Sequence, residues 1–276
     1  MFYKSIQKKK RWRIVTIAKF LKIMLFIVGA ILTRMFVIAK EINVKRHEVF
    51  VKNDQQQNQE LSLFFISDVH RRKLTPRLLK KVKEQIDAVI IGGDFAEQNV
   101  PLSRIEHNLK QLNRLAPVYF VWGNNDREVD EQAMRELFEK YEVRLLENEH
   151  QSLTADFTWG ICGTEDPSVK KVDIDKATAG IEVYNHVLFV SHQPRVWKVA
   201  EQVFQPTILL AGHTHGGQIR LGKFGIDELG SFTNDDGIVK LISNGYGTTK
   251  LPFRFGAHPE CHVIQIKKSE GEKDYD

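Results

Sequence analysis

The chain has 276 residues, 42% apolar and 27% charged, which is enough for one large α/β domain with a buried core and an appendage. Its net charge of +5 arises at the N-terminus, because residues 1–40 contain ten Lys or Arg and no Asp or Glu. The rest holds 30 basic and 35 acidic residues, which argues against a general nucleic-acid-binding surface. Cys162 and Cys261 form no metal-binding or redox pattern, and they fit either two buried thiols or one disulfide.

The N-terminal segment combines positive charge with an apolar run. Six basic residues between Lys4 and Arg13 precede the apolar segment Ile23–Ala39. About 20 apolar residues cross a bilayer, so we interpret this segment as a membrane anchor whose Lys22 and Arg34 reach the two interfaces. A cleaved signal peptide and an amphipathic helix on an anionic membrane surface are the alternatives. If the segment spans, the charge predicts a cytoplasmic N-terminus, which places the rest of the chain outside the cytoplasm.

In the first half of the domain, expected strands and helices alternate, and a polar stretch at residues 53–60 separates the first expected strand from the rest. Short runs rich in aliphatic and aromatic residues predict strands, and periodic apolar positions predict helices. The strands expected in this half are 47–52, 61–67, 88–91 and 117–122, and the helices are 75–86, 101–115 and 129–141. Thr75 followed by Pro76 is typical of a helix start. This alternation predicts an α/β sheet of βαβ units that is covered on both faces.

The second half is richer in strands. The expected segments are 144–146, 151–155, 158–162, 187–190, 207–211, 218–221, 238–242 and 261–266. The predicted organisation is therefore a basic N-terminus plus anchor at 1–40, a connecting strand and linker at 41–60, one catalytic domain at 61–267 and a polar tail at 268–276.

Five of the expected strands end at side chains that can bind a metal ion. Ligands gather at the carboxyl ends of strands in open α/β sheets. The central stretch is Gly212–Gln218, where His213 and His215 follow a buried strand and project to one side if the backbone is extended. The seven candidate ligands are Asp68, His70, Asp94, Asn124, His192, His213 and His215. Each motif alone also fits an ordinary turn, but together they indicate one site.

The chemistry of these groups points to a particular kind of metal centre. Carboxylate, imidazole and amide ligands suit Mn, Fe or Zn. Seven ligands are too many for one tetrahedral zinc ion. They suffice for two divalent ions about 3.5–4 Å apart that share a bridging carboxylate, the arrangement used in metal-assisted phosphoester hydrolysis. The sequence therefore predicts two divalent metal ions, and it leaves their identity open.

The order of the motifs resembles the calcineurin-like metallophosphoesterases. Asp-x-His, Gly-Asp, Gly-Asn-x-Asp, His and Gly-His-x-His follow one another between residues 61 and 267. The segment 244–248 is similar to a bacterial branch that carries an N-terminal anchor or export signal. The resemblance implies a four-layer α/β/β/α fold with two mixed sheets. It also implies that one metal is held by Asp68, His70, Asp94 and His215, and the other by Asp94, Asn124, His192 and His213, with Asp94 bridging.

One position departs from the family pattern. The family usually has Gly-Asn-His-Asp, with the histidine against the phosphoryl group, whereas this chain has Asn125. An amide donates hydrogen bonds but cannot act as a general acid near neutral pH, so we expect substrates with good leaving groups or a second acid. Arg71 and Arg254 are candidates for holding a substrate phosphate by bidentate contacts. The neighbouring Arg72 and Lys73 fit a solvated basic loop equally well.

The expected function is that of a dinuclear metal-dependent phosphoesterase. It would hydrolyse a phosphodiester or pyrophosphate bond by attack of a metal-bound hydroxide. The anchor suggests a lipid-linked or cell-envelope phosphate as substrate and membrane lipid as a partner of the N-terminus, and no general nucleic-acid binding is expected. The expected location is the cell membrane, with the domain on the extracytoplasmic side. A non-catalytic metal-binding scaffold and a nuclease-like member are the alternatives.

Overall fold

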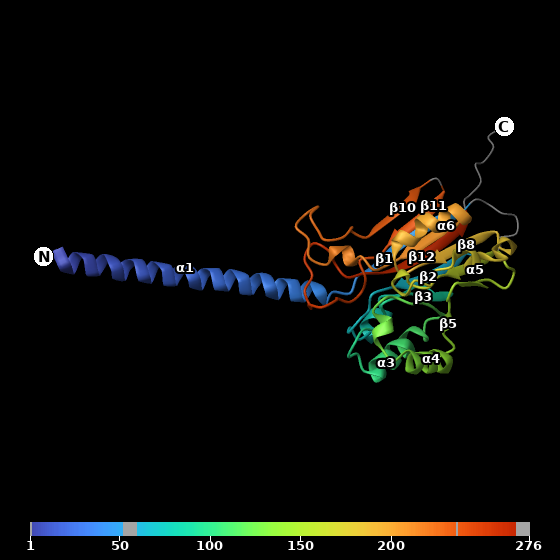
Figure 1. The fold of residues 1–276 in the computed structure, drawn as a ribbon, viewed down its shortest axis with the longest axis horizontal. Helices are drawn as coiled ribbons and strands as arrows, with labels where there is room; N and C mark the ends of the chain where they lie inside the picture. The colour runs from blue at the N-terminus through green and yellow to red at the C-terminus, as the bar shows by residue number, and fades with distance from the viewer. Residues whose placement is uncertain (1, 52–59, 236, 269–276) are drawn as a thin grey trace, which may run out of the picture.

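The computed structural model describes residues 2–51, 60–235 and 237–268. A long helix, α1 (Phe2–Ala39), extends away from a domain that contains all the other elements (Figure 1). Within it, Thr16–Ala39 has a mean hydropathy of 2.2 and is long and apolar enough to cross a membrane. Only 11% of this segment is buried, so α1 is not a core helix of the domain. The expected anchor lies inside this helix.

The first of two sheets has the strand order β1-β12-β2-β3-β4-β5. Its strands are β1 (Val44–Val51), β2 (Leu61–Ile66), β3 (Ala88–Gly92), β4 (Val118–Val121), β5 (Arg144–Leu145) and β12 (Cys261–Lys268). Neighbours from β2 to β5 are parallel, whereas β12 runs antiparallel to β2, so the sheet is mixed. The sheet therefore joins both ends of the domain, because β1 pairs with β12 in parallel.

The second sheet has the order β10-β11-β9-β8-β7-β6. Its strands are β6 (Glu149–Ser152), β7 (Trp159–Gly163), β8 (His186–Val190), β9 (Ile208–Ala211), β10 (Ser231–Asp235) and β11 (Ile238–Ile242). The four central strands are parallel and the two outer ones antiparallel to their neighbours. Both sheets are therefore mixed, as the sequence resemblance implies.

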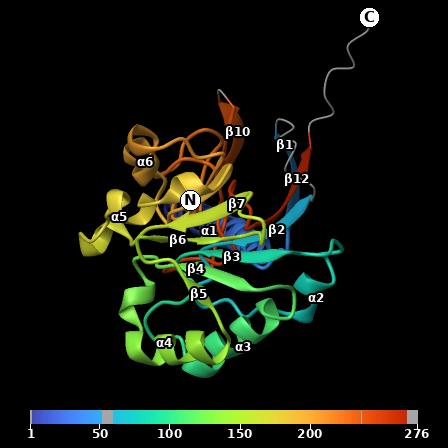
Figure 2. The same ribbon diagram turned by 90° about the vertical axis from the view of Figure 1, so that its right-hand side faces the viewer.

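The two sheets pack face to face, with helices on their outer sides (Figure 2). Alternate residues of a strand point to opposite faces, so Phe65 faces the second sheet whereas Phe64 faces the helices. The first sheet is covered by α3 (Leu102–Leu112) and α4 (Glu131–Lys140), and the second by α5 (Ile174–Thr178) and α6 (Trp197–Val203). The result is the predicted four-layer α/β/β/α arrangement.

Two expected elements are wrong. The helix expected at 75–86 is only α2 (Pro76–Leu79), and Val82 and Ile86 reach the core from turns beyond it. The strand expected at 218–221 is a loop with isolated bridges, because Gly217 and Gln218 both take left-handed φ angles of 70° and 51°. A side chain is disfavoured in that conformation within a strand.

Other differences concern the edges of the domain. The strand expected at 151–155 is β6, which begins and ends earlier, and α5, α6 and β10 were not predicted. Cys162 and Cys261 are both free and buried, so the disulfide alternative is wrong. Most of the polar stretch at 53–60, and the tail from residue 269, lie outside the described residues.

Candidate metal centre

Six of the predicted ligands lie in two neighbouring groups at the carboxyl ends of four strands. One group follows β2 and β9, and the other follows β3, β8 and β9, so both sheets contribute. In each group the ligand atoms lie within 4.8 Å of one another; the groups are Asp68, His70 and His215, and Asp94, His192 and His213. Parallel strands place their ends at one edge, which explains why segments so far apart in the chain meet.

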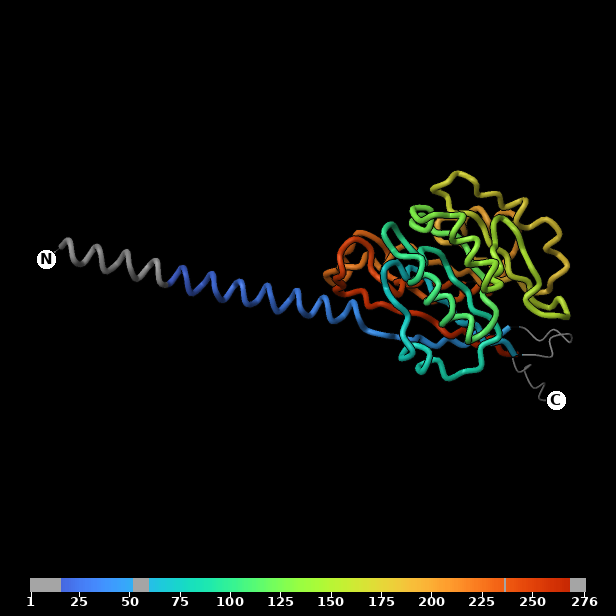
Figure 3. The backbone as a smooth tube through the Cα atoms, turned by 90° about the horizontal axis from the view of Figure 1, so that it is seen from below, coloured from blue at the N-terminus to red at the C-terminus, as the bar shows by residue number. Residues whose placement is uncertain are grey.

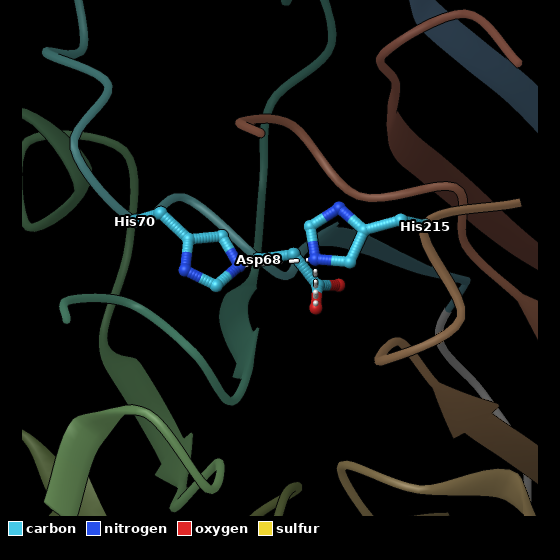
Figure 4. Close-up of side chains that lie close together, drawn as sticks. All are labelled: Asp68, His70 and His215. Atoms are coloured by element: carbon cyan, nitrogen blue, oxygen red, sulfur yellow. Dashed lines mark hydrogen bonds and ion pairs between the residues drawn. The ribbon is translucent and has the colours of Figure 1, made fainter. Parts of the chain in front are cut away.

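The first group is formed by two imidazoles and a carboxylate that point toward one another (Figure 4). Nε2 of His70 lies 3.0 Å from Nε2 of His215, which is 3.4 Å from Oδ1 of Asp68. Burial lowers the pKa of His215 to about 3, so this ring is neutral. A neutral imidazole is the form that binds a metal ion.

Asp94 faces both groups. Its Oδ2 lies 3.3 Å from Nε2 of His192 and 3.8 Å from Nε2 of His70. Nδ1 of His213 is 3.1 Å from the same nitrogen of His192. Burial acts to raise the pKa of Asp94, but the charge of His192 and a hydrogen bond with it hold this pKa well below its usual value. Asp94 is thus an ionised carboxylate positioned as a bridging ligand would be.

Asn124 offers a buried oxygen next to Asp94. Among the described residues its Oδ1 has no hydrogen-bond partner. The residues on either side of Asn124 lie close to Asp94. A Cβ on Gly123 would lie 2.2 Å from the backbone nitrogen of Asp94. The backbone N–H of Asn125 donates to Oδ1 of Asp94 at 2.8 Å. Because an unpaired buried polar atom costs roughly 1–3 kcal/mol, this oxygen fits a place in which an ion supplies the missing partner.

Groups behind the ligands fix the orientation of two rings. His192 donates from Nδ1 to the carbonyl of Gly92 at 2.9 Å. Nδ1 of His70 lies 2.9 Å from Oε2 of Glu97, whose other oxygen pairs with Arg71. Burial acts to raise the pKa of Glu97, but His70 and Arg71 lower it below its ordinary value. Such contacts direct the second ring nitrogen toward the candidate metal site, as is common for metal-binding histidines.

Glu97 is a functional candidate that the sequence reasoning missed. It follows Asp94 by three residues, so the signal was a second carboxylate close to a motif. Its contact with His70 depends on the parallel pairing of β2 with β3, which sequence spacing alone does not give.

The backbone of the site is held in an unusual conformation. Five of the predicted ligands have left-handed φ angles: Asp68 (53°), His70 (50°), Asp94 (50°), His213 (70°) and His215 (51°). Such residues cost about 1–3 kcal/mol each and persist only where the surroundings hold them. Asp and His tolerate this region better than most residues. The sharp turns point the side chains into the site immediately after their strands end.

The three residues predicted to contact substrate lie in different environments. Asn125 donates from its amide to Oδ2 of Asp94 at 2.6 Å, so it lies at the site. The Arg71 side chain is 61% exposed although it pairs with Glu97, so most of it remains accessible from solvent. Arg254 is fully buried and donates to backbone carbonyls of three segments, including His215 at 3.2 Å and Asn244 at 2.7 Å. We therefore infer that Arg254 supports the loops of the site, in place of the substrate contact expected from the sequence.

Similarity to known proteins agrees with this geometry. The model of the calcineurin-like phosphoesterase superfamily domain matches residues 61–223. The chain is 39% identical over 245 residues to YpbG of Bacillus subtilis (strain 168), covering 86% of this chain and 93% of that protein. It is 27% identical over 248 residues to the metallophosphoesterase YkoQ of the same organism, with 82% and 91% covered.

A further relative is described as a transmembrane protein. It is the "Transmembrane protein with metallophosphoesterase domain" of Danio rerio, 26% identical over 238 residues, with 76% of this chain and 54% of that protein covered. This relative and the apolar part of α1 both suggest membrane association. The family match, the two mixed sheets and the two ligand groups lead to one conclusion: the chain belongs to the calcineurin-like phosphoesterase superfamily.

Proposed function

We propose that this protein is a membrane-anchored hydrolase that cleaves a phosphodiester or pyrophosphate bond with the help of two divalent metal ions. The observation that carries the proposal is the position of Asp94, a buried carboxylate that faces a ligand group on either side. A single-metal site has no need for a carboxylate shared in this way, whereas a two-metal site does.

The proposed ligand sets follow the two groups. Asp68, His70 and His215 would hold one ion, and Asn124, His192 and His213 the other, with Asp94 shared. Two such ions supply hydroxide near neutral pH and offset the negative charge of the phosphoryl group. The chain itself orients the rings through Glu97 and the Gly92 carbonyl.

Asn125 and Arg71 are the proposed substrate contacts. The Asn125 amide lies at Asp94 and can donate a hydrogen bond to a phosphoryl oxygen, but it cannot protonate a leaving group near neutral pH. The proposed substrates are therefore those with good leaving groups, such as phosphoanhydrides. A lipid-linked or cell-envelope phosphate is proposed because of the anchor. The basic residues in the first part of α1, before its apolar segment, support a domain on the extracytoplasmic side.

The test is a metal titration of the full-length protein in detergent. The protein is stripped of metal, Mn²⁺ is added, and hydrolysis of bis-p-nitrophenyl phosphate is followed. We expect activity to saturate at two ions per chain. We expect Asp94→Asn to lower it roughly 100-fold or more, since even substitutions behind the ligands cost 10–100-fold. The matched control is Asp156→Asn, which changes an exposed aspartate and should leave activity unchanged.

Two outcomes would favour other functions. Two bound Mn²⁺ ions without hydrolysis of the diester, of UDP-glucose or of ADP-ribose would favour the metal-binding scaffold. Activity on single-stranded DNA that falls steeply with salt would favour the nuclease-like alternative.

A further inference from the structure

Two loops of the domain expose large apolar side chains to solvent. They are residues 219–229, between β9 and β10, and residues 250–255, between β11 and β12; we call them the apolar loops. The exposed fractions of Ile226, Leu221 and Phe224 are 93%, 74% and 70%. No other large apolar side chain that the structure describes outside α1 is as exposed. Leu251 on the second loop is 57% exposed. The two loops hydrogen-bond to each other, and large exposed apolar side chains gathered in this way indicate a binding surface.

The apolar loops lie at the end of the membrane helix. The backbone N–H of Arg254 donates to the carbonyl of Met35 at 3.1 Å, and Met35 and Ile38 are buried against the domain. Arg72 donates to the carbonyl of Lys40 at 2.9 Å, which fixes the exit of α1. In two perpendicular views the loops reach back beside the last turns of α1 (Figures 1 and 3). They are thus the part of the domain nearest to the N-terminal half of α1.

The dimensions of α1 place the loops at the membrane surface. The stretch from Thr16 to Met35 is about 30 Å long at 1.5 Å per residue, which equals the hydrocarbon thickness of a bilayer. The apolar loops contact the helix at Met35, where this length ends. Their exposed charged residues balance, with Lys223 and Lys250 against Asp227 and Glu228, and their two arginines are buried. Electrostatic attraction is therefore weak, and burial of the apolar side chains has to supply the binding free energy.

We infer that the apolar loops are a lipid-contact surface, with Leu221, Phe224 and Ile226 inserted into the leaflet from which α1 emerges. Large apolar and aromatic side chains are favoured at this depth. The occupant is the phospholipid of the same membrane, because α1 holds the loops beside it in every molecule.

The surface also sets the orientation of the metal centre. A cavity of about 520 Å³ is lined by His213 together with Asp227 and Glu228 of the first apolar loop. A second cavity, of about 200 Å³, is lined by Lys40, Glu97 and Lys250 among others. The first cavity reaches a candidate ligand and both cavities adjoin the apolar loops, so insertion of the loops would hold the site against the headgroup layer.

The inference is tested by fluorescence on the full-length protein in phosphatidylcholine nanodiscs. Phe224→Cys and Leu221→Cys proteins are labelled with the fluorophore NBD, and Cys162 and Cys261 do not interfere because they are buried. The matched control is Val183→Cys, which is 55% exposed and lies in the chain between α5 and β8. These two elements are labelled at the end of the domain away from α1 (Figure 1). We expect several-fold stronger quenching by nitroxide-labelled lipid at 224 and 221 than at 183, with weaker quenching by iodide.

Other outcomes would overturn the inference. Equal lipid quenching at 224, 221 and 183 would mean that the loops do not reach the bilayer. Protection of 224 from iodide without lipid quenching would mean that a second copy or another protein covers the loops. The readout is independent of hydrolysis, so a protein that inserts its loops but cleaves no substrate would refute the proposed function alone.

Discussion

At the scale of single residues, Asn125 is the residue proposed to limit which leaving groups the site can handle. Its amide donates to Oδ2 of Asp94 at 2.6 Å, a position from which a histidine could reach a substrate oxygen. We expect Asn125→His to raise turnover of an alkyl phosphodiester by about 10- to 100-fold, less than the full effect of a general acid. Bis-p-nitrophenyl phosphate should change little, because its leaving group needs no proton. The two substrates are compared by kcat, with Asn125→Gln as control.

An equal gain on both substrates would show that the new histidine acts in another way, for example through binding. No gain on either would mean that the leaving group is protonated elsewhere or not at all.

Glu97 provides a second test at this scale. Its carboxylate lies 2.9 Å from Nδ1 of His70 and also pairs with Arg71. Glu97→Gln keeps the size but removes the charge, so we expect metal affinity to fall about 10- to 100-fold. Excess Mn²⁺ should restore most of kcat. The measurement is a Mn²⁺ titration by calorimetry and by activity, with Glu139→Gln, an exposed glutamate on α4, as control. Unchanged affinity would leave Glu97 a purely structural residue.

The sequence predicted the candidate metal ligands better than the residues that hold them in place. The candidate ligands could be found because each stands at the end of an apolar strand, and six of them do meet. Their roles as ligands remain a proposal. Glu97 and the buried position of Arg254 could not be found, because both depend on which loops pack together. A guanidinium that serves backbone carbonyls looks the same in a sequence as one that binds phosphate.

At the scale of elements, apolar runs predicted strands more reliably than apolar periodicity predicted helices. Nearly every predicted strand is present, because an uninterrupted apolar run such as Ile208–Ala211 has to be buried. The helix expected at 75–86 shows the limit: Val82 and Ile86 are buried as a helix would bury them, yet turns hold them there. Periodicity reports which side chains face the core, and it does not report the backbone between them.

Two histidines on neighbouring strands, His262 on β12 and His47 on β1, should make stability depend on pH. Nδ1 of His262 lies 3.0 Å from Nε2 of His47, and its Nε2 lies 2.9 Å from the Ser243 hydroxyl. Burial, together with the charges of His47 and Lys45, lowers the pKa of His262 well below its ordinary value. The nearby Glu260, 3.7 Å away, does not reverse this. The folded protein therefore keeps His262 neutral.

The sign of the effect follows from this lowered pKa. The unfolded state binds a proton at about pH 6.5, whereas the folded state does so only at lower pH. Stability should thus be highest above pH 6.5 and should fall below it by up to about 1.4 kcal/mol per pH unit. We expect His262→Gln to flatten this slope. Denaturant unfolding in EDTA between pH 5 and 7 measures it, and an unchanged slope would show that other groups cause the loss.

At the scale of the whole molecule, the apolar helix and the layers were predictable and the face of the domain proposed to meet the membrane was not. An apolar helix and an alternation of strands and helices are local patterns, and they survive as α1 and the four layers. The apolar loops lack such a pattern: residues 219–229 contain scattered Leu, Phe and Ile between glycines. Their position next to α1 follows from the hydrogen bond between Arg254 and Met35, two residues that are far apart in the sequence.

The left-handed ligand positions set stability and activity against each other in this protein. Five residues that cost about 1–3 kcal/mol each add up to a sum comparable with the net stability of a typical domain. Glycine at such a position would relax the backbone while deleting a proposed ligand. Selection for thermal tolerance alone would therefore tend to dismantle the site, and attempts to stabilise this enzyme should leave the turns after β2, β3 and β9 untouched.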